Sequence, residues 1–258
     1  MEGEHRDLAT AMIRTGREAA SLLARAAFPH SCRSCGAEGK VLCEGCAAAE
    51  LVPLEGIFVC PGCGTRSPLG SQCGRPKCRA ASPLDGIASA APYARPALRE
   101  LVRLWKYERV DEAGEALLRH FEAFVRRHRH AFDAFAGPAA VMPVPMHPFR
   151  EAYRGFDQAA LLAEAFRGVT GAPAAPGVLR RRFRWSAQAA LADDAARAKN
   201  AQGSVRASVQ AAGRSFVLID DVVTTGATLS ACAAALRAAG AVSVRAVTLL
   251  SGQKNRPV

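Results

Sequence analysis

The sequence lacks the apolar run of about eighteen residues that a membrane-spanning helix requires. It also lacks the uninterrupted apolar core of a signal peptide, because Arg14, Arg17 and Arg25 divide the N-terminal segment. The apolar side chains of residues 6–28 are instead spaced as on one amphipathic helix, which favours a docking helix over a membrane anchor. We therefore expect a cytoplasmic protein with no integral membrane segment.

Signatures of several common enzyme classes are absent as well. There is no Gly-x-Ser-x-Gly elbow and no Walker phosphate-binding motif, so hydrolase and P-loop functions have no support. The six histidines show no spacing typical of metal ligands, and no internal repeat exists beyond the paired cysteines.

The composition is that of a folded, basic protein. Half of the 258 residues are hydrophobic and only 6% are aromatic, which suits alanine-rich helices packed on a sheet. This length accommodates one large domain and a small one. The formal net charge of +11 predicts attraction to polyanions, either nucleic acid or phosphorylated substrates.

Eight of the nine cysteines are concentrated in the first third of the chain, in four closely spaced pairs. Without an export signal, this pattern indicates metal ligands rather than disulfides. Sequential pairing predicts two structural zinc sites, although the spacing also allows a cross-braced arrangement and hence one or two ions. A redox-active dithiol is the alternative, and Cys232 is expected to be a buried apolar side chain. The predicted ligands are Cys32, Cys35, Cys43 and Cys46, followed by Cys60, Cys63, Cys73 and Cys78.

Apolar periodicity beyond the cysteines predicts alternating strands and helices, and therefore a parallel sheet. We expect a cysteine-rich module over 1–83 and an α/β domain over 84–258. Strands are expected at 86–93 (on a sheet edge), 139–144, 215–221 and 242–250. Helices are expected at 98–104, 113–124, 158–168 (ending at a glycine) and 229–239 (ending at Gly240).

The segment from Phe216 to Thr228 is the most specific signal in the sequence. An apolar strand ends in two carboxylates, Asp220 and Asp221, and a turn of hydroxyls and glycine then opens a helix. Unpaired amides at such a turn suit a phosphate, whereas the carboxylates suit sugar hydroxyls or magnesium. An ordinary acidic turn is the alternative. The candidate phosphate-binding residues are Thr224, Thr225, Gly226, Ala227 and Thr228.

This segment resembles the signature of type I phosphoribosyltransferases, and a second motif resembles the ComF branch of that family. The second motif is a Pro-Val-Pro stretch from Pro143, spaced arginines, and then Arg154-Gly-Phe-Asp-Gln158. Further similar stretches are Phe28-Pro29, Lys106-Tyr107 and residues 186–203, so the resemblance covers about 28–250. Asp157 replaces the usual asparagine, Ser204 the usual aromatic residue, and Thr224 the carboxylate of purine-type relatives.

The resemblance implies a type I phosphoribosyltransferase fold, a parallel sheet flanked by helices, behind a zinc-ribbon module. It implies binding of phosphoribosyl pyrophosphate or a related phosphorylated sugar with Mg²⁺. The catalytic candidates would be Asp220 and Asp221, which hold the ribose, and Arg154. The 5-phosphate would meet the turn after the strand. The pyrophosphate would meet Val144, Pro145, Met146, His147 and Arg150.

Alternatives remain for the basic residues. Arg150 and Arg154 can bind phosphate or pair with Glu151 and Asp157, and His147 can be an ordinary loop histidine. The segment 180–185 can stack nucleic-acid bases, close over a substrate, or form a solvated basic strand with two core aromatics.

Two functions follow from the resemblance. The first is a phosphoribosyltransferase that transfers ribosyl phosphate to a nucleophile. The second is a non-catalytic accessory protein that binds single-stranded DNA, together with DNA-uptake proteins, during natural competence. In that role the sugar diphosphate would be a regulatory ligand or the fold only a scaffold. A nucleotide-responsive regulator without turnover is a third, weaker possibility.

Overall fold

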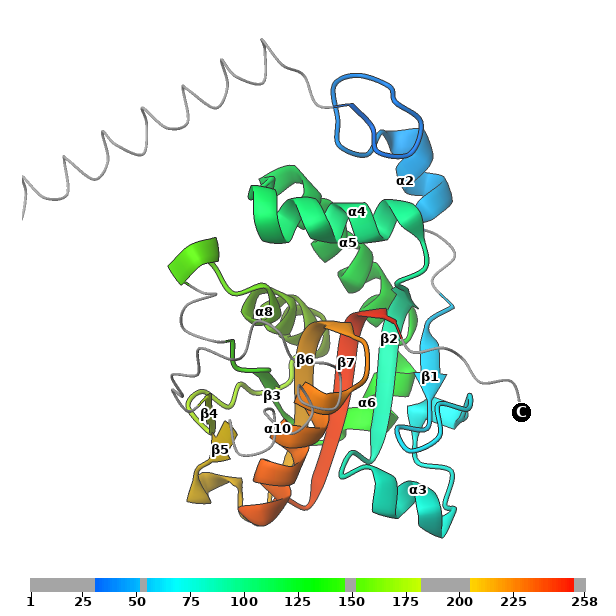
Figure 1. Ribbon diagram of the computed structural model, residues 1–258. Coiled ribbons are helices and arrows are strands. Elements are labelled where there is room, and N and C mark those ends of the chain that lie inside the picture. Colours follow the sequence, from blue (N-terminus) through cyan, green and yellow to red (C-terminus); the bar gives the residue numbers. More distant parts are fainter. Residues whose placement is uncertain (1–30, 52–54, 147–151, 182–204, 253–258) are drawn as a thin grey trace, which may run out of the picture.

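The computed structural model describes residues 31–51, 55–146, 152–181 and 205–252 (Figure 1). The helix expected over 6–28 and the Phe28-Pro29 stretch lie outside these ranges, as do His147, Arg150 and most of the segment 180–185. Within them, no helix is both long and apolar enough to cross a membrane.

The core of the fold is a five-stranded sheet with the strand order β1-β2-β7-β6-β3. Four neighbouring strands are parallel, and the short edge strand β1 pairs antiparallel with β2. In chain order the strands are β1 (Ile57–Val59), β2 (Gly86–Pro92), β3 (Ala140–Pro143), β6 (Ser215–Val223) and β7 (Ser243–Ser251). A separate antiparallel pair consists of β4 (Leu179–Arg181) and β5 (Val205–Ala207).

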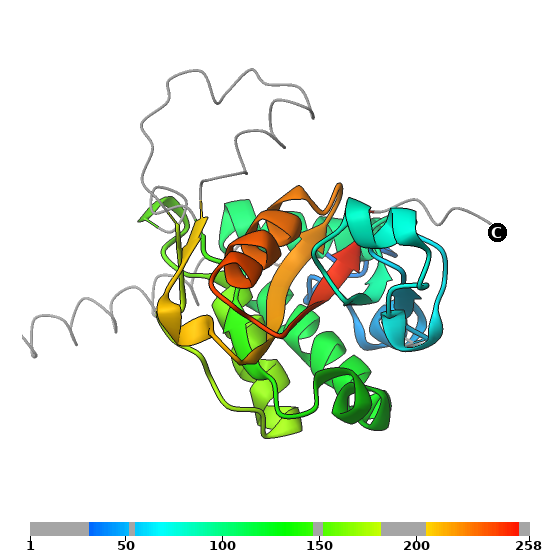
Figure 2. The same cartoon turned by 90° about the horizontal axis from the view of Figure 1, so that it is seen from below.

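Helices cover both faces of this sheet (Figure 2). Side chains alternate along β6, so Val217 and Ile219 face one core while Phe216 and Leu218 face the other. The first core contains α4 (Pro96–Arg103), α5 (Asp111–Arg127), α6 (Arg129–Ala136) and α8 (Gln158–Thr170). The second contains α10 (Ala227–Ala238) and the short helix η4 (Val209–Ala211). The chain is therefore an α/β protein, as expected.

Most of the predicted elements are confirmed with small shifts of their ends. The helix expected over 158–168 continues to Thr170, because Gly168 stays helical and Gly171 takes the left-handed conformation (φ 73°) that ends it. The helix expected over 229–239 begins two residues earlier, at Ala227, directly after Gly226 (φ 76°).

One prediction about the sheet is wrong. The strand over 86–93 was expected at an edge because it ends in a proline, but β2 lies inside the sheet between β1 and β7. Pro92 is tolerated because it is the last residue of the strand, where the ladder ends. Strand β1 belongs to the cysteine-rich segment, yet it pairs with β2 and so extends the sheet of the α/β domain. The division between 83 and 84 stays a prediction.

Candidate ligand-binding site and cysteine clusters

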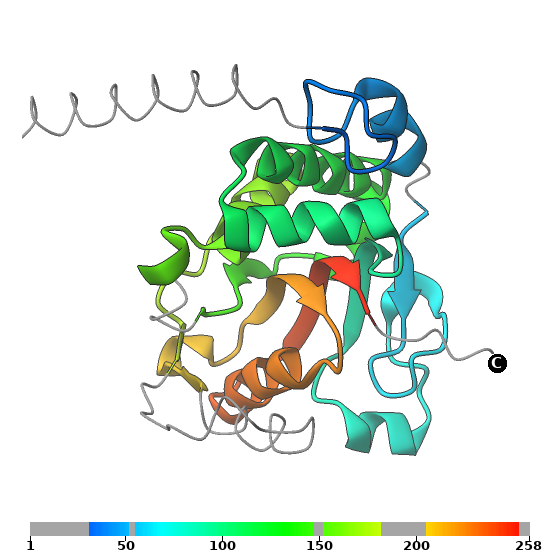
Figure 3. The same ribbon diagram turned by 45° about the horizontal axis from the view of Figure 1, so that its top comes forward.

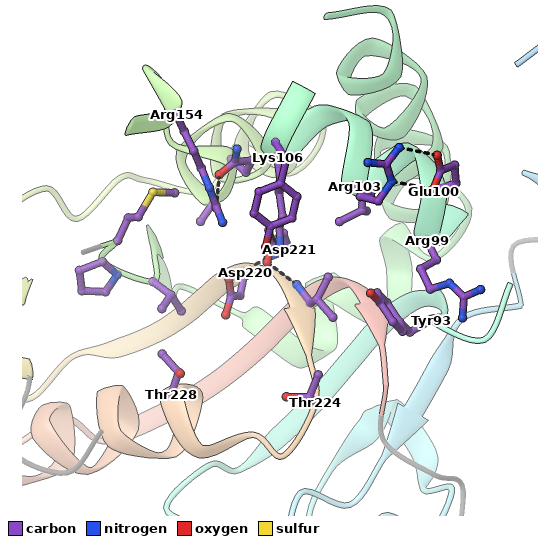
Figure 4. Close-up of a pocket in the computed structure, with 18 of the residues that line it drawn as sticks. Tyr93, Arg99, Glu100, Arg103, Lys106, Arg154, Asp220, Asp221, Thr224 and Thr228 are labelled. Carbon is purple, nitrogen blue, oxygen red and sulfur yellow. Dashed lines mark hydrogen bonds and ion pairs between the residues drawn. The ribbon is translucent and has the colours of Figure 1, made fainter. Parts of the chain in front are cut away.

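A cavity of about 470 Å³ lies beyond the carboxyl ends of β3 and β6 (Figure 4). This edge of a parallel sheet is the usual ligand-binding position in open α/β folds. The cavity brings together the two separate motifs singled out in the sequence. Its lining includes Asp220, Asp221, Thr224, Thr228 and Arg154, together with Val144, Pro145 and Met146.

The two carboxylates differ in their surroundings. An oxygen of Asp220 accepts a hydrogen bond from the Asp221 amide (2.9 Å), and an oxygen of Asp221 accepts one from the Val222 amide (2.7 Å). The second oxygen of Asp221 forms an ion pair with Lys106. Burial, followed by the negative charge of Asp221, raises the pKa of Asp220 to about 8. Burial and the neighbouring charge therefore make the charged form of the Asp220 carboxyl less favourable than that of an exposed aspartate.

The turn after β6 presents a helix N-terminus to the cavity. Gly226, at the N-cap of α10, adopts a left-handed backbone conformation that residues with a side chain rarely take. The Thr225 hydroxyl accepts a hydrogen bond from the Ala227 amide at 3.3 Å. The side chains of Thr224 and Thr228 line the cavity itself (Figure 4). Because the first amides of a helix lack intrahelical partners, this turn can accept an anion.

Arg154 is held in place by two neighbours. Its guanidinium donates to the Gln158 side chain at 3.1 Å and lies 5.4 Å from the centre of the Tyr107 ring. Only 9% of Arg154 is exposed. Asp157 has a different role, since its side chain accepts a hydrogen bond from the Ala160 amide and caps α8. Arg154 is therefore a preorganised cation at the cavity wall.

The structure adds residues to the site for which the sequence suggested no role. Lys106 and Tyr107 belong to η2 (Leu104–Glu108), a π-helical segment that follows α4. Gln158 is fully buried and lines the cavity, and its side-chain nitrogen has no hydrogen-bond partner among the described residues. The Lys106-Tyr107 pair at a helix end was the only sequence signal for this wall of the cavity.

The predicted zinc ligands gather into two separate clusters in the order of the sequence. Within each cluster the four Sγ atoms lie within 4.8 Å of one another. The Sγ atoms of Cys35 and Cys43 are 3.7 Å apart, and those of Cys63 and Cys73 are 3.8 Å apart. A tetrahedral site with zinc–sulfur bonds of ~2.3 Å requires a separation of about 3.8 Å. The first cluster is Cys32, Cys35, Cys43 and Cys46, and the second is Cys60, Cys63, Cys73 and Cys78.

Both clusters share one local design that suits a metal. In each, a backbone amide donates to a sulfur at 3.4 Å, from Cys43 to Cys32 and from Cys73 to Cys60. A glycine with positive φ follows the second ligand of each cluster. The last ligand of each cluster lies within a short helix, Cys46 in α2 (Glu44–Glu50) and Cys78 in α3 (Pro76–Ala81). Each cluster can therefore bind one zinc ion, and the cross-braced alternative does not match the geometry.

The clusters are attached to different parts of the core. The first packs beside α4 and α5, where Cys32, Val41 and Leu42 are buried in the core (Figure 3). In the second, the side chain of Gln72 donates to the carbonyls of Ser82 and Leu84, in the segment that leads into β2.

Comparison with known proteins agrees with this architecture. A model of the phosphoribosyl transferase domain family matches residues 170–257. The match and the mostly parallel sheet, which extends beyond the matched residues, define a type I phosphoribosyltransferase fold. The chain is 31% identical over 209 residues to the DNA utilization protein YhgH of Escherichia coli K12, covering 79% of this chain and 87% of that protein. This chain belongs to the ComF family.

Two further comparisons are more distant. Competence protein F of Haemophilus influenzae is 27% identical over 208 residues, with the same shares of the two chains covered. Among solved structures, the glutamine phosphoribosylpyrophosphate amidotransferase of B. subtilis, in complex with ADP and GMP, gives a TM-score of 0.36 at 18% identity. That similarity covers 53% of this chain and 26% of the other.

Proposed function

We propose that the domain over 84–258 binds phosphoribosyl pyrophosphate together with Mg²⁺ in the cavity at the carboxyl ends of β3 and β6. The observation that carries this proposal is the meeting of an acidic pair, a helix N-terminus and a buried arginine around one cavity. These groups complement the hydroxyls and the two anionic ends of a sugar that is phosphorylated at both ends.

Each part of the ligand has a matching group in this arrangement. The turn 224–228 and the N-terminus of α10 would hold the 5-phosphate. Asp220 and Asp221 would accept hydrogen bonds from ribose hydroxyls. Residues 144–146 and Arg154 would hold the pyrophosphate.

The acidic pair fits magnesium, because hard divalent cations prefer carboxylate oxygen ligands and retain several waters. When bound, Mg²⁺ would offset the negative charge that builds on a pyrophosphate leaving group. The described residues would contribute by positioning the sugar and stabilising charge, with no protein nucleophile required. On this basis the proposed activity is that of a phosphoribosyltransferase. Thr224 cannot protonate a purine ring as a carboxylate would.

We also propose that each cysteine cluster holds one structural zinc ion. Four thiolates complete a tetrahedral site and leave no position open for chemistry. This favours a structural role over a redox-active dithiol.

The binding proposal is tested by calorimetric titration of magnesium phosphoribosyl pyrophosphate into the full chain. Saturable binding is expected for the wild type and its loss for an Asp220→Asn/Asp221→Asn variant. The matched control is Asp111→Asn/Asp133→Asn, which removes two exposed carboxylates outside the cavity. Absence of binding by a folded wild type would overturn the proposal. Equal binding by the acidic-pair variant would overturn the assigned site.

A second candidate function is handling of single-stranded DNA on the cytoplasmic side of the membrane, with the sugar diphosphate as a regulatory ligand. The net charge of +11 and the names of the relatives favour it. Arg99, Arg103, Lys106, Arg154 and Arg181 line the same cavity. Binding to single-stranded DNA should then weaken steeply as salt increases, because each phosphate contact releases counterions. A salt-independent affinity, or none, would exclude this role.

A further inference from the structure

The ammonium group of Lys106 lies beside Asp221, where a divalent cation bound to that carboxylate would also lie. Its ammonium group forms an ion pair with one oxygen of Asp221, and the other oxygen of Asp221 already accepts the Val222 amide (Figure 4). The side chains of Lys106 and Asp221 are only 15% and 13% exposed. An ion pair shielded to this degree is weakened less by solvent than a surface pair. Each oxygen of Asp221 already has one partner, and a metal that binds to Asp221 must compete with the positive charge of Lys106 beside it.

The backbone around Lys106 is irregular in a way that directs this side chain. The segment η2 is π-helical, and Arg109 directly after it has a positive φ of 55°. A π-helical turn is rare, and a positive φ is uncommon for a residue other than glycine. Both features occur frequently at functional sites. Such an arrangement persists only where neighbouring packing compensates for its cost.

Packing on both sides of Lys106 holds the segment in this conformation. Trp105 is buried, and its ring centre lies 5.8 Å from that of Phe156 in the arginine-containing motif. On the outer side, Arg103 bridges Glu100 and Glu108 through hydrogen bonds of 2.6 to 2.9 Å. Lys106 thus extends from a fixed base, and a change of partner requires movement of its side chain only.

The cavity offers Lys106 a second kind of partner. Arg154, which we assign to the pyrophosphate, lies over the ring of the neighbouring Tyr107. An anionic ligand held there would approach the same wall of the cavity that carries Lys106. A divalent cation that entered alone would have to displace the ammonium group, and Lys106 would gain no anion in exchange.

We propose that Lys106 is an internal counter-ion of Asp221 that excludes free divalent cations and transfers to the anionic group of a metal–diphosphate ligand on binding. This inference rests on the proposed function and narrows its ligand to a preformed complex of a divalent cation with a diphosphate. Lys106 would act as a specificity-determining residue, because it weakens the binding of metal alone and strengthens the binding of the metal complex.

The test uses two probes whose affinities should change in opposite directions. Mn²⁺ alone is titrated into the zinc-loaded full chain and followed by electron paramagnetic resonance, and magnesium pyrophosphate is titrated calorimetrically. For Lys106→Met we expect Mn²⁺ to bind about tenfold more tightly and magnesium pyrophosphate about tenfold more weakly, a change typical of one partly buried charge. Lys106→Arg, which keeps the charge, should leave Mn²⁺ binding weak.

The control is Arg119→Met, which removes one positive charge from an exposed position on α5. Unchanged Mn²⁺ affinity in Lys106→Met, or a loss of affinity for both probes, would overturn the inference. Thermal unfolding of each variant separates a folding defect from a site effect. If phosphoribosyl pyrophosphate fails to bind the wild type, the proposed function fails, whereas the two opposite shifts still decide the role of Lys106.

Discussion

The Asp85 carboxylate and the Arg237 guanidinium form an ion pair that joins the start of β2 to the last turn of α10. The same carboxylate accepts hydrogen bonds from the Ser243 hydroxyl at 2.9 Å and the Val244 amide at 2.8 Å. One side chain therefore connects a helix and two neighbouring strands at the end of the sheet opposite the cavity.

Replacement of Asp85 by alanine should lower the free energy of unfolding by about 2 kcal/mol, because it leaves three donors without their acceptor. Chemical denaturation measures the loss. Glu122→Ala is the control, since the ion pair of Glu122 with Arg126 spans one helical turn at the surface and its loss should cost under about 0.5 kcal/mol. Similar losses in both variants would show that the network adds nothing beyond an ordinary surface pair.

Gly114→Ala should destabilise the protein although alanine favours helices. A methyl group at Gly114 would lie 2.4 Å from the Trp105 ring nitrogen, and Trp105 is too buried to move aside. Overpacking of this kind costs about 1 to 3 kcal/mol. Gly168→Ala in α8 is the matched control, because no atom lies within 4 Å of its methyl position, and it should gain about 0.5 to 1 kcal/mol. Thermal unfolding of the two variants should therefore shift in opposite directions.

The purified chain should contain two zinc ions, and each cluster should lose its own ion independently. Cys35→Ser and Cys63→Ser should each reduce the zinc content by one ion and lower the melting temperature, because metal binding contributes to folding. Native mass spectrometry measures the zinc content. Cys232→Ala should keep both ions, since Cys232 is a buried residue of α10 and belongs to neither cluster. Loss of both ions from either serine variant would instead indicate one shared site.

Acidification should destabilise the protein through His120. Burial lowers the pKa of His120 to about 4, below its usual value, and its ring nitrogen lies 2.9 Å from the Leu51 carbonyl oxygen. The pKa of His120 is about 6.5 in the unfolded chain and about 4 in the folded one. Between these values the unfolded chain binds the proton and the folded chain does not, so the free energy of unfolding falls as the pH decreases from about 6.5 toward 4.

His120→Gln measures this contribution without a titrating group. Between pH 7 and pH 5 the wild type should lose about 2 kcal/mol more than the variant. Loss of zinc at low pH affects both proteins equally and cancels in the difference. Parallel stability curves would contradict a buried, neutral His120.

The acidic strand and the turn after it could be predicted because their determinants are local. The apolar run of β6, the two carboxylates, Gly226 and the helix α10 follow one another directly in the sequence. Backbone preference and hydrophobic periodicity suffice to place such an element. The C-terminal end of α8 was less predictable, because both Gly168 and Gly171 could end the helix and only the backbone conformation, left-handed at Gly171, shows which one does.

The short edge strand β1 was not predictable. Three residues are too few to show an alternating pattern, and its partner β2 lies well along the chain. The same holds for Lys106, whose contact with Asp221 depends on how α4 and η2 pack over the end of the sheet. A lysine at a helix end carries no sequence signal for such a partner.

The sequence by itself determined the chemistry available to this protein: eight paired thiols, an acidic strand end, a hydroxyl-rich turn and an arginine-containing motif. Local spacing encodes these features because each depends on neighbouring residues. Only the tertiary structure decided which thiols share a cluster and that the two motifs line one cavity. It also decided that Lys106 forms an ion pair with Asp221. Those contacts join residues distant in the chain, and the packing of helices on a parallel sheet is what brings them together.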